Sequence, residues 1–307
     1  MTPPPPVVVV AIVTYRRPDD LRTALTAVLP EARASDAGVL VVDNDPAGSA
    51  REVVAAFATD GVEYTSEPTP GIAAARNRAM STTADSRFVV FLDDDEQPEP
   101  GWLQALLATA RDSGAAAVAG PVVSVYDVEP DAWVRAGRFF DRRRLPTGTR
   151  IDQAATNNLL LDHDQLDGLR FDPAFGLTGG SDTLFTRTLA RRGRRLVWCD
   201  EAVVLDRVPV GRIERSWVLR RAFRMSNTGV RVDLVLATGV IARSVVRVRD
   251  AARGLTRVAG GGASMLLGAL TRSRGRRVRG LRTVVRGAGM VSATVGHVHA
   301  EYRRDAG

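Results

Sequence analysis

The first 93 residues alternate short apolar runs with segments that carry apolar residues at helical spacing. The runs occupy residues 7–15, 39–45 and 87–92, and the first reads VVVVAIVTY; the short segment VEYT, 62–65, is a further predicted strand. Such unbroken apolar runs are typical of strands covered on both faces, and strands that alternate with helices form parallel sheets. The sequence therefore predicts an α/β fold with a doubly wound, mostly parallel central sheet.

Polar residues gather where three of these predicted strands end. The first run ends at Thr14 and Tyr15, the second contains Asp43, and the run 87–92 leads into the acidic stretch DDDE, residues 93–96. An isolated acidic stretch suits a solvated turn equally well. In open α/β sheets, however, ligands bind beyond the carboxyl ends of the strands. We therefore expect the three clusters to meet at one rim and to form a binding site.

The acidic stretch has a spacing suited to a metal ion. Asp93 and Asp95 stand at alternate positions, so both carboxylates can reach a common ion, and oxygen ligands suit Mg²⁺ or Mn²⁺. These ions often take substrate phosphates as further ligands, which implies a phosphorylated partner. A calcium loop is the competing interpretation, but residues 93–104 lack the central Gly and closing Glu of an EF-hand.

Five motifs follow one another in a recognisable order. They read AIVTYRRPDDL, VVDN, PGIAAARN, FLDDDEQPEPGWL and GGSDTLFTRTLARRG. Together they resemble the inverting glycosyltransferases of family 2, and the resemblance covers about residues 7–225. It implies the GT-A fold, a Rossmann-like nucleotide-diphospho-sugar transferase fold. It also implies a hexosyltransferase-type activity in cell envelope polysaccharide biosynthesis.

The resemblance implies a donor site for a nucleotide sugar of the UDP, dTDP or GDP type. Thr14 and Tyr15 are then expected at the base and ribose, Asp43 at the base edge, and Arg76 beside the base and phosphates. Each residue has a plainer alternative. Tyr15 could pack in the core, Arg76 could be an exposed helical residue, and Asp43 could cap a loop.

The family's DXD motif falls on Asp93 and Asp95. By this resemblance Asp93 faces the ribose and the metal, and Asp95 ligates the Mg²⁺ or Mn²⁺ that bridges the diphosphate. Asp94 is the variable middle position and is expected to point away. A cation at this place would offset charge on the leaving nucleotide.

Inverting transfer needs a carboxylate that deprotonates the acceptor hydroxyl. Asp182 matches this base, in the first turn of a predicted helix that Ser181 can cap. The family usually has Glu-Asp here, so Ser181 departs from its pattern and puts the acceptor contacts in doubt. A plain charge at a helix N-terminus is the alternative for Asp182.

Four further residues are weaker candidates. Asp206 lies near the place where many relatives have a metal-ligating His, and it either replaces that ligand or pairs with Arg207. Asn157 and Asn158 could hydrogen-bond acceptor hydroxyls or cap a strand. Trp217 could stack on an acceptor sugar or pack in the interior.

The domain organisation follows the charge. We expect a disordered Pro-rich start at 1–6, the glycosyltransferase domain at 7–229, and a basic, mainly helical region at 230–307. From Arg231 onward fifteen arginines oppose four acidic residues, a net charge of +11, whereas the whole chain carries +7. The first 230 residues therefore sum to −4.

Val278, Leu281 and Val285 form a narrow helical stripe flanked by arginines within this basic region. The stripe could lie on an anionic membrane surface and bring the enzyme to a lipid-linked acceptor, or it could pack on the catalytic domain. Nucleic acid is not an expected partner, because aromatic residues are nearly absent there. The lone Cys199 favours a cytoplasmic protein, with peripheral attachment to the inner face of the membrane as a further expectation.

The sequence thus predicts transfer of a single sugar, with inversion, from a nucleotide-diphosphate sugar to a glycan or lipid-linked acceptor. Two other classes remain open. A nucleotidyltransferase of the same fold would be expected to carry a Gly-rich basic loop after the first strand, where this chain has TYRRPDDL. A non-catalytic protein could instead use the basic region to bind membrane surfaces.

Overall fold

The computed structural model describes residues 6–298, so all of the predicted disordered start except Pro6 lies outside the described residues. The chain divides into two compact units, each built from several segments. Unit 1 comprises Met1–Ser124, Arg142–Leu177 and Ser181–Arg207, and unit 2 comprises Val125–Asp141, Thr178–Gly180 and Val208–Gly307. The domain boundary predicted at 229/230 falls inside one helix of unit 2.

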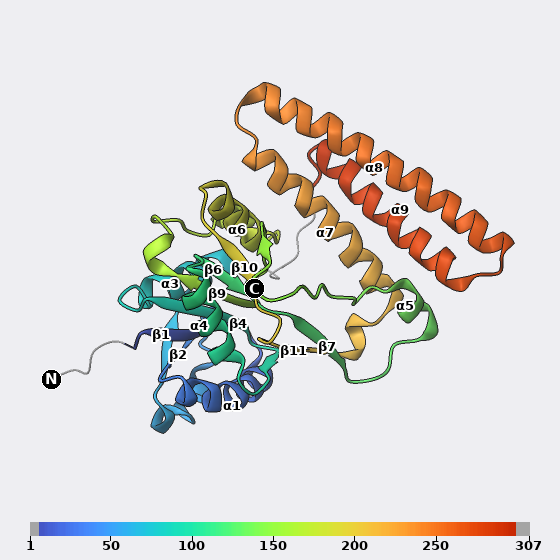
Figure 1. The fold of residues 1–307 in the computed structure, drawn as a ribbon. Coiled ribbons are helices and arrows are strands. Elements are labelled where there is room, and N and C mark those ends of the chain that lie inside the picture. Colours follow the sequence, from blue (N-terminus) through green and yellow to red (C-terminus); the bar gives the residue numbers. More distant parts are fainter. Residues whose placement is uncertain (1–5, 299–307) are drawn as a thin grey trace. The chain divides into compact units, whose positions relative to one another are not determined.

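Unit 1 is built on an eight-stranded sheet with the strand order β3-β2-β1-β4-β9-β6-β10-β8 (Figure 1). Its strands are β1 (Val8–Thr14), β2 (Gly38–Asp43), β3 (Val62–Ser66), β4 (Phe88–Asp93), β6 (Ala117–Ala119), β8 (Arg150–Ile151), β9 (Asn158–Asp162) and β10 (Leu196–Trp198). The four strands predicted from the sequence form the parallel half, β3-β2-β1-β4. Beyond β4 the sheet is mixed, because β9 runs antiparallel to both β4 and β6.

Helices cover both faces of this sheet, as the unbroken apolar strands predict. They are α1 (Pro18–Ala34), α2 (Arg51–Ala55), α3 (Ile72–Thr82), α4 (Trp102–Ser113) and α6 (Ser181–Arg191). Val10 and Ile12 of β1 belong to the core under α1 and α4, whereas Ala11 and Val13 belong to the core under α3 and α6. Successive side chains of a strand point to opposite faces, so one apolar run supplies both cores.

A second, three-stranded sheet has the order β5-β11-β7. Its strands are β5 (Glu96–Pro98), β7 (Val122–Tyr126) and β11 (Val204–Val208). Four 3₁₀ helices complete the connections described between residues 6 and 298: η1 (Ala58–Asp60), η2 (His163–Gln165), η3 (Pro173–Phe175) and η4 (Val210–Arg212). Because β5 begins three residues after β4 ends, the acidic stretch forms the tight connection between the two sheets.

The described helices of unit 2 are α5 (Ala132–Gly137), α7 (Arg215–Leu236), α8 (Gly239–Leu270) and α9 (Arg274–Thr294). Helices α8 and α9 form an antiparallel hairpin, and α9 lies between α8 and α7 (Figure 1). Ser273 caps α9 by accepting a hydrogen bond from the amide of Arg276. Within the described residues, no helix is both long and apolar enough to cross a membrane.

The stripe predicted on α9 is partly internal to unit 2. Val278 is buried, and its side chain lies against Gly137 of α5. Leu281 and Val285 are half-buried. The structure therefore favours packing over membrane contact for this stripe, although the packing is within unit 2.

Candidate active site

The carboxyl ends of β1 and β4 meet at one rim of the large sheet, as predicted. The parallel register of the two strands places Val13 beside Asp93. The hydroxyl of Thr14 donates a hydrogen bond of 2.7 Å to the carboxylate of Asp94. Thr14 is itself buried, so the structure gives its hydroxyl a partner inside the protein in place of an open position at the ribose.

Arg17, just before α1, holds the acidic stretch from outside. Its Nη1 atom lies 3.0 Å from Asp94 Oδ1 and 3.0 Å from Asp95 Oδ2. Burial raises the pKa of the Asp94 carboxyl to about 6, although Arg17 and Thr14 lower it. Asp94 points toward these two residues, which agrees with its expected position away from the ligand.

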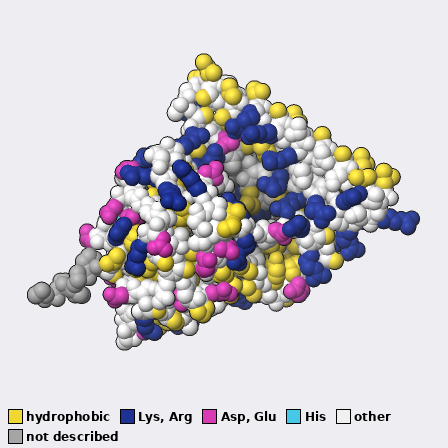
Figure 2. Space-filling model, viewed as in Figure 1, with side chains coloured by type: hydrophobic (Ala, Val, Ile, Leu, Met, Phe, Trp, Pro, Cys, Tyr) yellow, Lys and Arg dark blue, Asp and Glu magenta, His cyan; other side chains and the backbone are white. Residues whose placement is uncertain are grey.

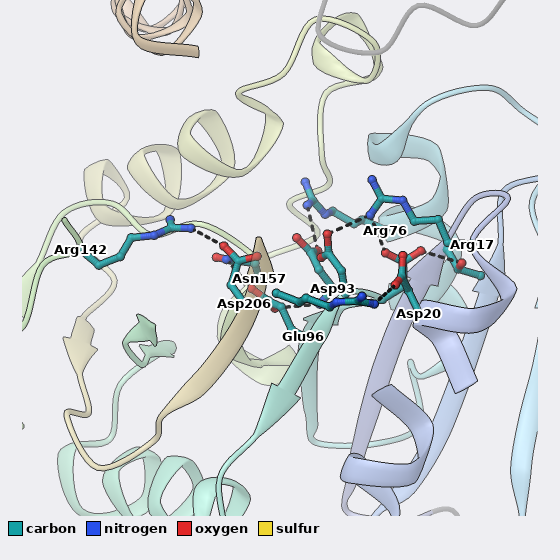
Figure 3. Close-up of polar contacts among 12 residues, drawn as sticks. Arg17, Asp20, Arg76, Asp93, Glu96, Arg142, Asn157 and Asp206 are labelled. Carbon is teal, nitrogen blue, oxygen red and sulfur yellow. Dashed lines mark hydrogen bonds and ion pairs between the residues drawn. The ribbon is translucent and has the colours of Figure 1, made fainter. Parts of the chain in front are cut away.

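Asp93 and Arg76 face each other at the rim (Figure 3). Arg76 Nη2 lies 4.0 Å from Asp93 Oδ1, and 40% of the Asp93 side-chain surface stays exposed. Burial by the surrounding protein raises the pKa of Asp93 to about 7, Arg76 lowers it, and the nearby charges of Asp95, Asp94 and Asp182 raise it. Asp93 is thus a partly open carboxylate that would be stabilised by a further positive charge.

Arg76 connects the acidic stretch to α6. It is buried on α3, and its Nη1 atom donates a hydrogen bond of 3.1 Å to the hydroxyl of Ser181. Its guanidinium also lies over the ring of Phe171, 5.7 Å from the centroid. The alternative of an exposed helical Arg76 is therefore wrong. Ser181, the residue that departs from the family pattern, is where this arginine is fixed.

Asp182 lies in the first turn of α6, beside Ser181. Its Oδ1 atom accepts a hydrogen bond of 2.6 Å from the amide of Thr183. Its charge contributes to the raised pKa of Asp93, so the two carboxylates lie within each other's electrostatic field.

Glu96 is the most deeply buried acid of the stretch, with 1% of its surface exposed. It accepts hydrogen bonds from the amide of Asp93, at 3.1 Å, and from the side-chain amide of Asn157, at 2.7 Å (Figure 3). It also stands directly opposite Asp206 in the β5–β11 pair. Burial, followed by the charges of Asp93, Asp95 and Asp206, raises the pKa of Glu96 well above its usual range.

Asp206 has a partner other than the one predicted. Its Oδ2 atom accepts a hydrogen bond of 2.8 Å from Arg142, which also appears in Figure 3. Arg207 instead lies 3.7 Å from Asp20. The expected Asp206–Arg207 pair is therefore replaced by two pairs, because neighbouring residues of a strand point to opposite faces.

The side chains of Asp43 and Asn158 form hydrogen bonds within the protein. The carboxylate of Asp43 is fully buried and accepts hydrogen bonds from the amides of Asp45 and Ala50 and from the Tyr64 hydroxyl. These contacts favour the loop-capping alternative over a direct contact with the base edge. Asn158 accepts from the Trp102 indole and donates to the carbonyls of Pro121 and Ala202. These three contacts favour a structural role for Asn158 over a contact with the acceptor.

The two aromatic candidates differ in environment. Tyr15 is half-buried, and the guanidinium of Arg16 lies 5.1 Å from its ring centroid. Trp217 belongs to unit 2, where its ring stacks on Phe140 with an interplanar angle of 4° and carries Arg221 on its face. This environment favours the packing alternative for Trp217.

Three residues that form contacts at the rim were not predicted from the sequence: Arg17, Glu96 and Arg142. Arg17 had a local signal, because it follows the first strand directly and precedes the acids of α1. Glu96 also had one, since it continues the acidic stretch. Arg142 had none, because its contact with Asp206 joins segments far apart in the chain.

The rim suits a divalent cation whose coordination shell is completed by a bound substrate. Within residues 6–298 no three His, Cys, Asp or Glu side chains are arranged as a preformed metal site. Mg²⁺ and Mn²⁺ are commonly held by one or two carboxylates together with substrate phosphates. The open carboxylate of Asp93 and the neighbouring Asp95 would provide the oxygen ligands if such a cation were bound.

Comparison with protein families supports the resemblance drawn from the motifs. The profile for glycosyl transferase family 2 matches residues 9–174. The chain belongs to glycosyl transferase family 2. The matched segment contains Thr14, Asp43, Arg76 and residues 93–96 but ends before Asp182. As a family 2 member the chain is a glycosyltransferase, which decides against the nucleotidyltransferase and the non-catalytic alternatives.

Two characterised relatives agree with this family membership. The chain is 35% identical over 238 residues to the succinoglycan biosynthesis protein ExoM of Rhizobium meliloti (strain 1021), covering 75% of this chain and 76% of that protein. It is 26% identical over 196 residues to the glycosyltransferase AglE of Haloferax volcanii, covering 62% of this chain and 64% of that protein.

Two solved structures share the fold at 14% sequence identity. GalNAc-T7, crystallised with UDP, GalNAc and Mn²⁺, superposes with a TM-score of 0.57, covering 74% of this chain and 47% of that chain. Staphylococcus aureus TarS superposes with a TM-score of 0.53, covering 78% of this chain and 41% of that chain. Both are GT-A glycosyltransferases, so the predicted GT-A fold is confirmed.

Proposed function

We propose that this family 2 glycosyltransferase moves a single sugar, with inversion, from a nucleotide-diphosphate sugar to a glycan or lipid-linked acceptor in a metal-dependent reaction. The observation that carries the proposal is the set of contacts at the rim in which Arg76 donates to Ser181 and faces the open carboxylate of Asp93. Asp182, the proposed proton acceptor, follows Ser181 and contributes to the raised pKa of Asp93. The name of the relative ExoM supports polysaccharide biosynthesis as the setting.

Asp93 and Asp95 would hold Mg²⁺ or Mn²⁺ together with the donor diphosphate. The bound cation supplies charge that stabilises the leaving nucleotide. Arg17 fixes Asp95 and Asp94, while Thr14 fixes Asp94 from within the sheet. These contacts keep the acidic stretch in one conformation before the donor arrives, which lowers the cost of ordering it on binding.

Arg76 would orient the donor phosphates, because its guanidinium is already fixed by Ser181 and lies beside Asp93. Tyr15, half-buried at the end of β1, remains our candidate for the base or ribose. Asp43 would act on the base indirectly by holding the loop of residues 44–50. Asn157, fixed on Glu96, is the acceptor candidate nearest to the acidic stretch.

Asp182 would take the proton from the attacking acceptor hydroxyl. The proton moves from the hydroxyl oxygen to the carboxylate as the new glycosidic bond forms and the bond to the leaving diphosphate breaks. Asp206, paired with Arg142 and opposite Glu96, would support the β5–β11 side of the rim without ligating the metal. A cytoplasmic enzyme that attaches peripherally to the inner face of the membrane would meet a lipid-linked acceptor there.

The replacement Asp182→Asn tests the proposal. A general base contributes about 10²- to 10⁴-fold, so transfer of label from the nucleotide sugar to extracted glycan and lipid fractions should fall by about 100-fold or more. The melting-temperature rise caused by UDP, GDP or dTDP with Mn²⁺ should persist, because the donor contacts are unchanged. Transfer at the wild-type rate would contradict the assignment.

Glu52→Gln is the matched control for this substitution. Glu52 is an exposed acid in the first turn of α2, so it shares the helix position of Asp182 but lies outside the rim. Its replacement should leave both transfer and nucleotide binding unchanged. An equal loss in the two variants would mean that helix charge alone explains the effect.

A further inference from the structure

The outward face of α8 is apolar along its whole length. Large hydrophobic side chains recur on it at intervals of three or four residues, interrupted by two longer gaps in which alanines occupy the same face. They are Ile241 (83% exposed), Val245 (60%), Val248 (71%), Leu255 (60%), Leu266 (70%) and Leu270 (83%). Figure 2 shows them as a row of hydrophobic side chains along the outer edge of α8.

This row, which we call the α8 stripe, is a continuous surface. Ala252, Ala259 and Ala263 occupy the helical positions between its large members, so the stripe contains no charged residue. A helix of 32 residues is about 48 Å long at ~1.5 Å per residue. An apolar surface of this extent on a protein marks an interaction site.

The stripe is not the face that α8 uses for packing. Three glycines, Gly254, Gly261 and Gly268, lie on the opposite side of α8, where they touch the backbone of α9. A helix with a single apolar stripe normally turns it toward the core. Here the small residues face the neighbouring helix and the large apolar residues face outward, so the stripe is left for a partner.

The net positive charge of the α8–α9 hairpin indicates which kind of partner would bind the stripe. Between Gly239 and Thr294 the sequence has twelve arginines and one acidic residue, Asp250. Arg249 and Arg253 pair with Asp250. The exposed Arg257 contacts Met290 of α9, and the exposed Arg276 and Arg277 of α9 lie beside Gly268, so these three arginines gather where the two helices meet. Figure 2 shows Arg side chains on the inner side of the hydrophobic row.

We propose that the α8 stripe is a docking surface for an anionic lipid bilayer, on which α8 lies parallel to the membrane plane. An apolar helix face on a strongly basic hairpin suits a bilayer, whose acyl chains take up the apolar face and whose anionic headgroups attract the basic hairpin. A second copy of this chain fits less well, because face-to-face pairing would bring two strongly basic hairpins together. The proposal concerns unit 2 alone and does not depend on the transfer reaction.

Vesicle co-sedimentation of the full chain tests the proposal. The wild type should bind vesicles of phosphatidylglycerol mixed with phosphatidylcholine and bind pure phosphatidylcholine much less. The triple variant Val248→Ser, Leu255→Ser, Leu266→Ser should lose at least about tenfold in partitioning, because these side chains supply the apolar contact. Its far-UV circular dichroism should match the wild type, since all three side chains face outward.

The matched control is Val125→Ser, Val128→Ser, Val210→Ser. These three valines are about half exposed and also lie in unit 2, but outside the α8 stripe. The control should bind vesicles like the wild type. Equal binding by the stripe variant and the wild type, or no binding of the wild type to anionic vesicles, would overturn the proposal. So would a wild-type dimer in sedimentation that the stripe variant dissociates, if vesicles do not bind.

Discussion

Individual carboxylates of the stretch 93–96 differ in what surrounds them. Asp94 and Glu96 point inward to hydrogen-bond donors, whereas Asp93 and Asp95 lie at the rim. Burial, and to a smaller extent the charge of the neighbouring acids, raises the pKa of Asp93, Asp94 and Glu96. Like charges held together in this way are stabilised by a cation, and Arg17 and Arg76 supply only part of that charge.

Replacing Arg76 by Lys should separate the effect of charge from that of geometry. Lysine keeps the positive charge but cannot contact Ser181 and Asp93 from two fixed nitrogen atoms. A lost charge-assisted hydrogen bond is worth about 1.5–3 kcal/mol, so kcat/KM should fall by about tenfold to 100-fold. Arg78→Lys, an exposed arginine on the same helix, should have little effect. Unchanged kcat/KM in Arg76→Lys would show that charge alone matters.

The sequence identified the residues of the rim more readily than their partners. A polar residue at a strand end looks the same whether it faces a ligand or a neighbour. Asn158 is an example, because its three partners come from α4 and from two distant loops. Asp43 is another, since the Tyr64 hydroxyl that reaches it lies on β3, which pairs with β2.

At the scale of elements, local patterns predicted β1 to β4 and their helices but not the rest of the large sheet. β1, β2 and β4 are apolar runs, and β1 to β3 are each followed by a helix. Strands β6, β8 and β10 have only two or three residues each, too few for a sequence pattern. Their place in the sheet depends on pairing with β9 and with one another, which are contacts between distant segments.

The packing of α8 against α9 can be tested at the consecutive glycines 260–262, because only Gly261 faces α9. A Cβ atom on Gly261 would lie 2.7 Å from the Gly280 carbonyl oxygen, whereas one on Gly260 would meet nothing within 4 Å. Gly261→Ala should therefore destabilise the protein by about 1–3 kcal/mol through overpacking. Gly260→Ala should stabilise it by up to about 1 kcal/mol through helix propensity. Urea unfolding followed by circular dichroism would compare them, and equal midpoints would contradict this packing.

At the scale of the whole molecule, charge and function divide between the two units. Every rim residue from Thr14 to Asp206 lies in unit 1, whereas the basic helices α8 and α9 lie in unit 2. The sequence captured this division as a net charge of −4 followed by +11, but it singled out the α9 stripe, whereas we propose the α8 stripe as the membrane face. Both α8 and α9 carry apolar residues at helical spacing, and only the packing of the hairpin shows that the α9 stripe is partly covered and the α8 stripe is exposed.

This division predicts that two ligands protect two different parts of the chain from hydrogen exchange. A nucleoside diphosphate with Mn²⁺ at about 100 times its Kd stabilises the folded state by about 2.7 kcal/mol, and the protection should appear in unit 1, around residues 14–17 and 93–96. Chelating the metal or replacing Asp95 by Ala should remove it, because the cation joins the diphosphate to the acids. Anionic vesicles should instead protect α8. Nucleotide protection that appears in α8 and spares residues 93–96 would contradict both assignments, because the donor would then bind on the surface assigned to lipid.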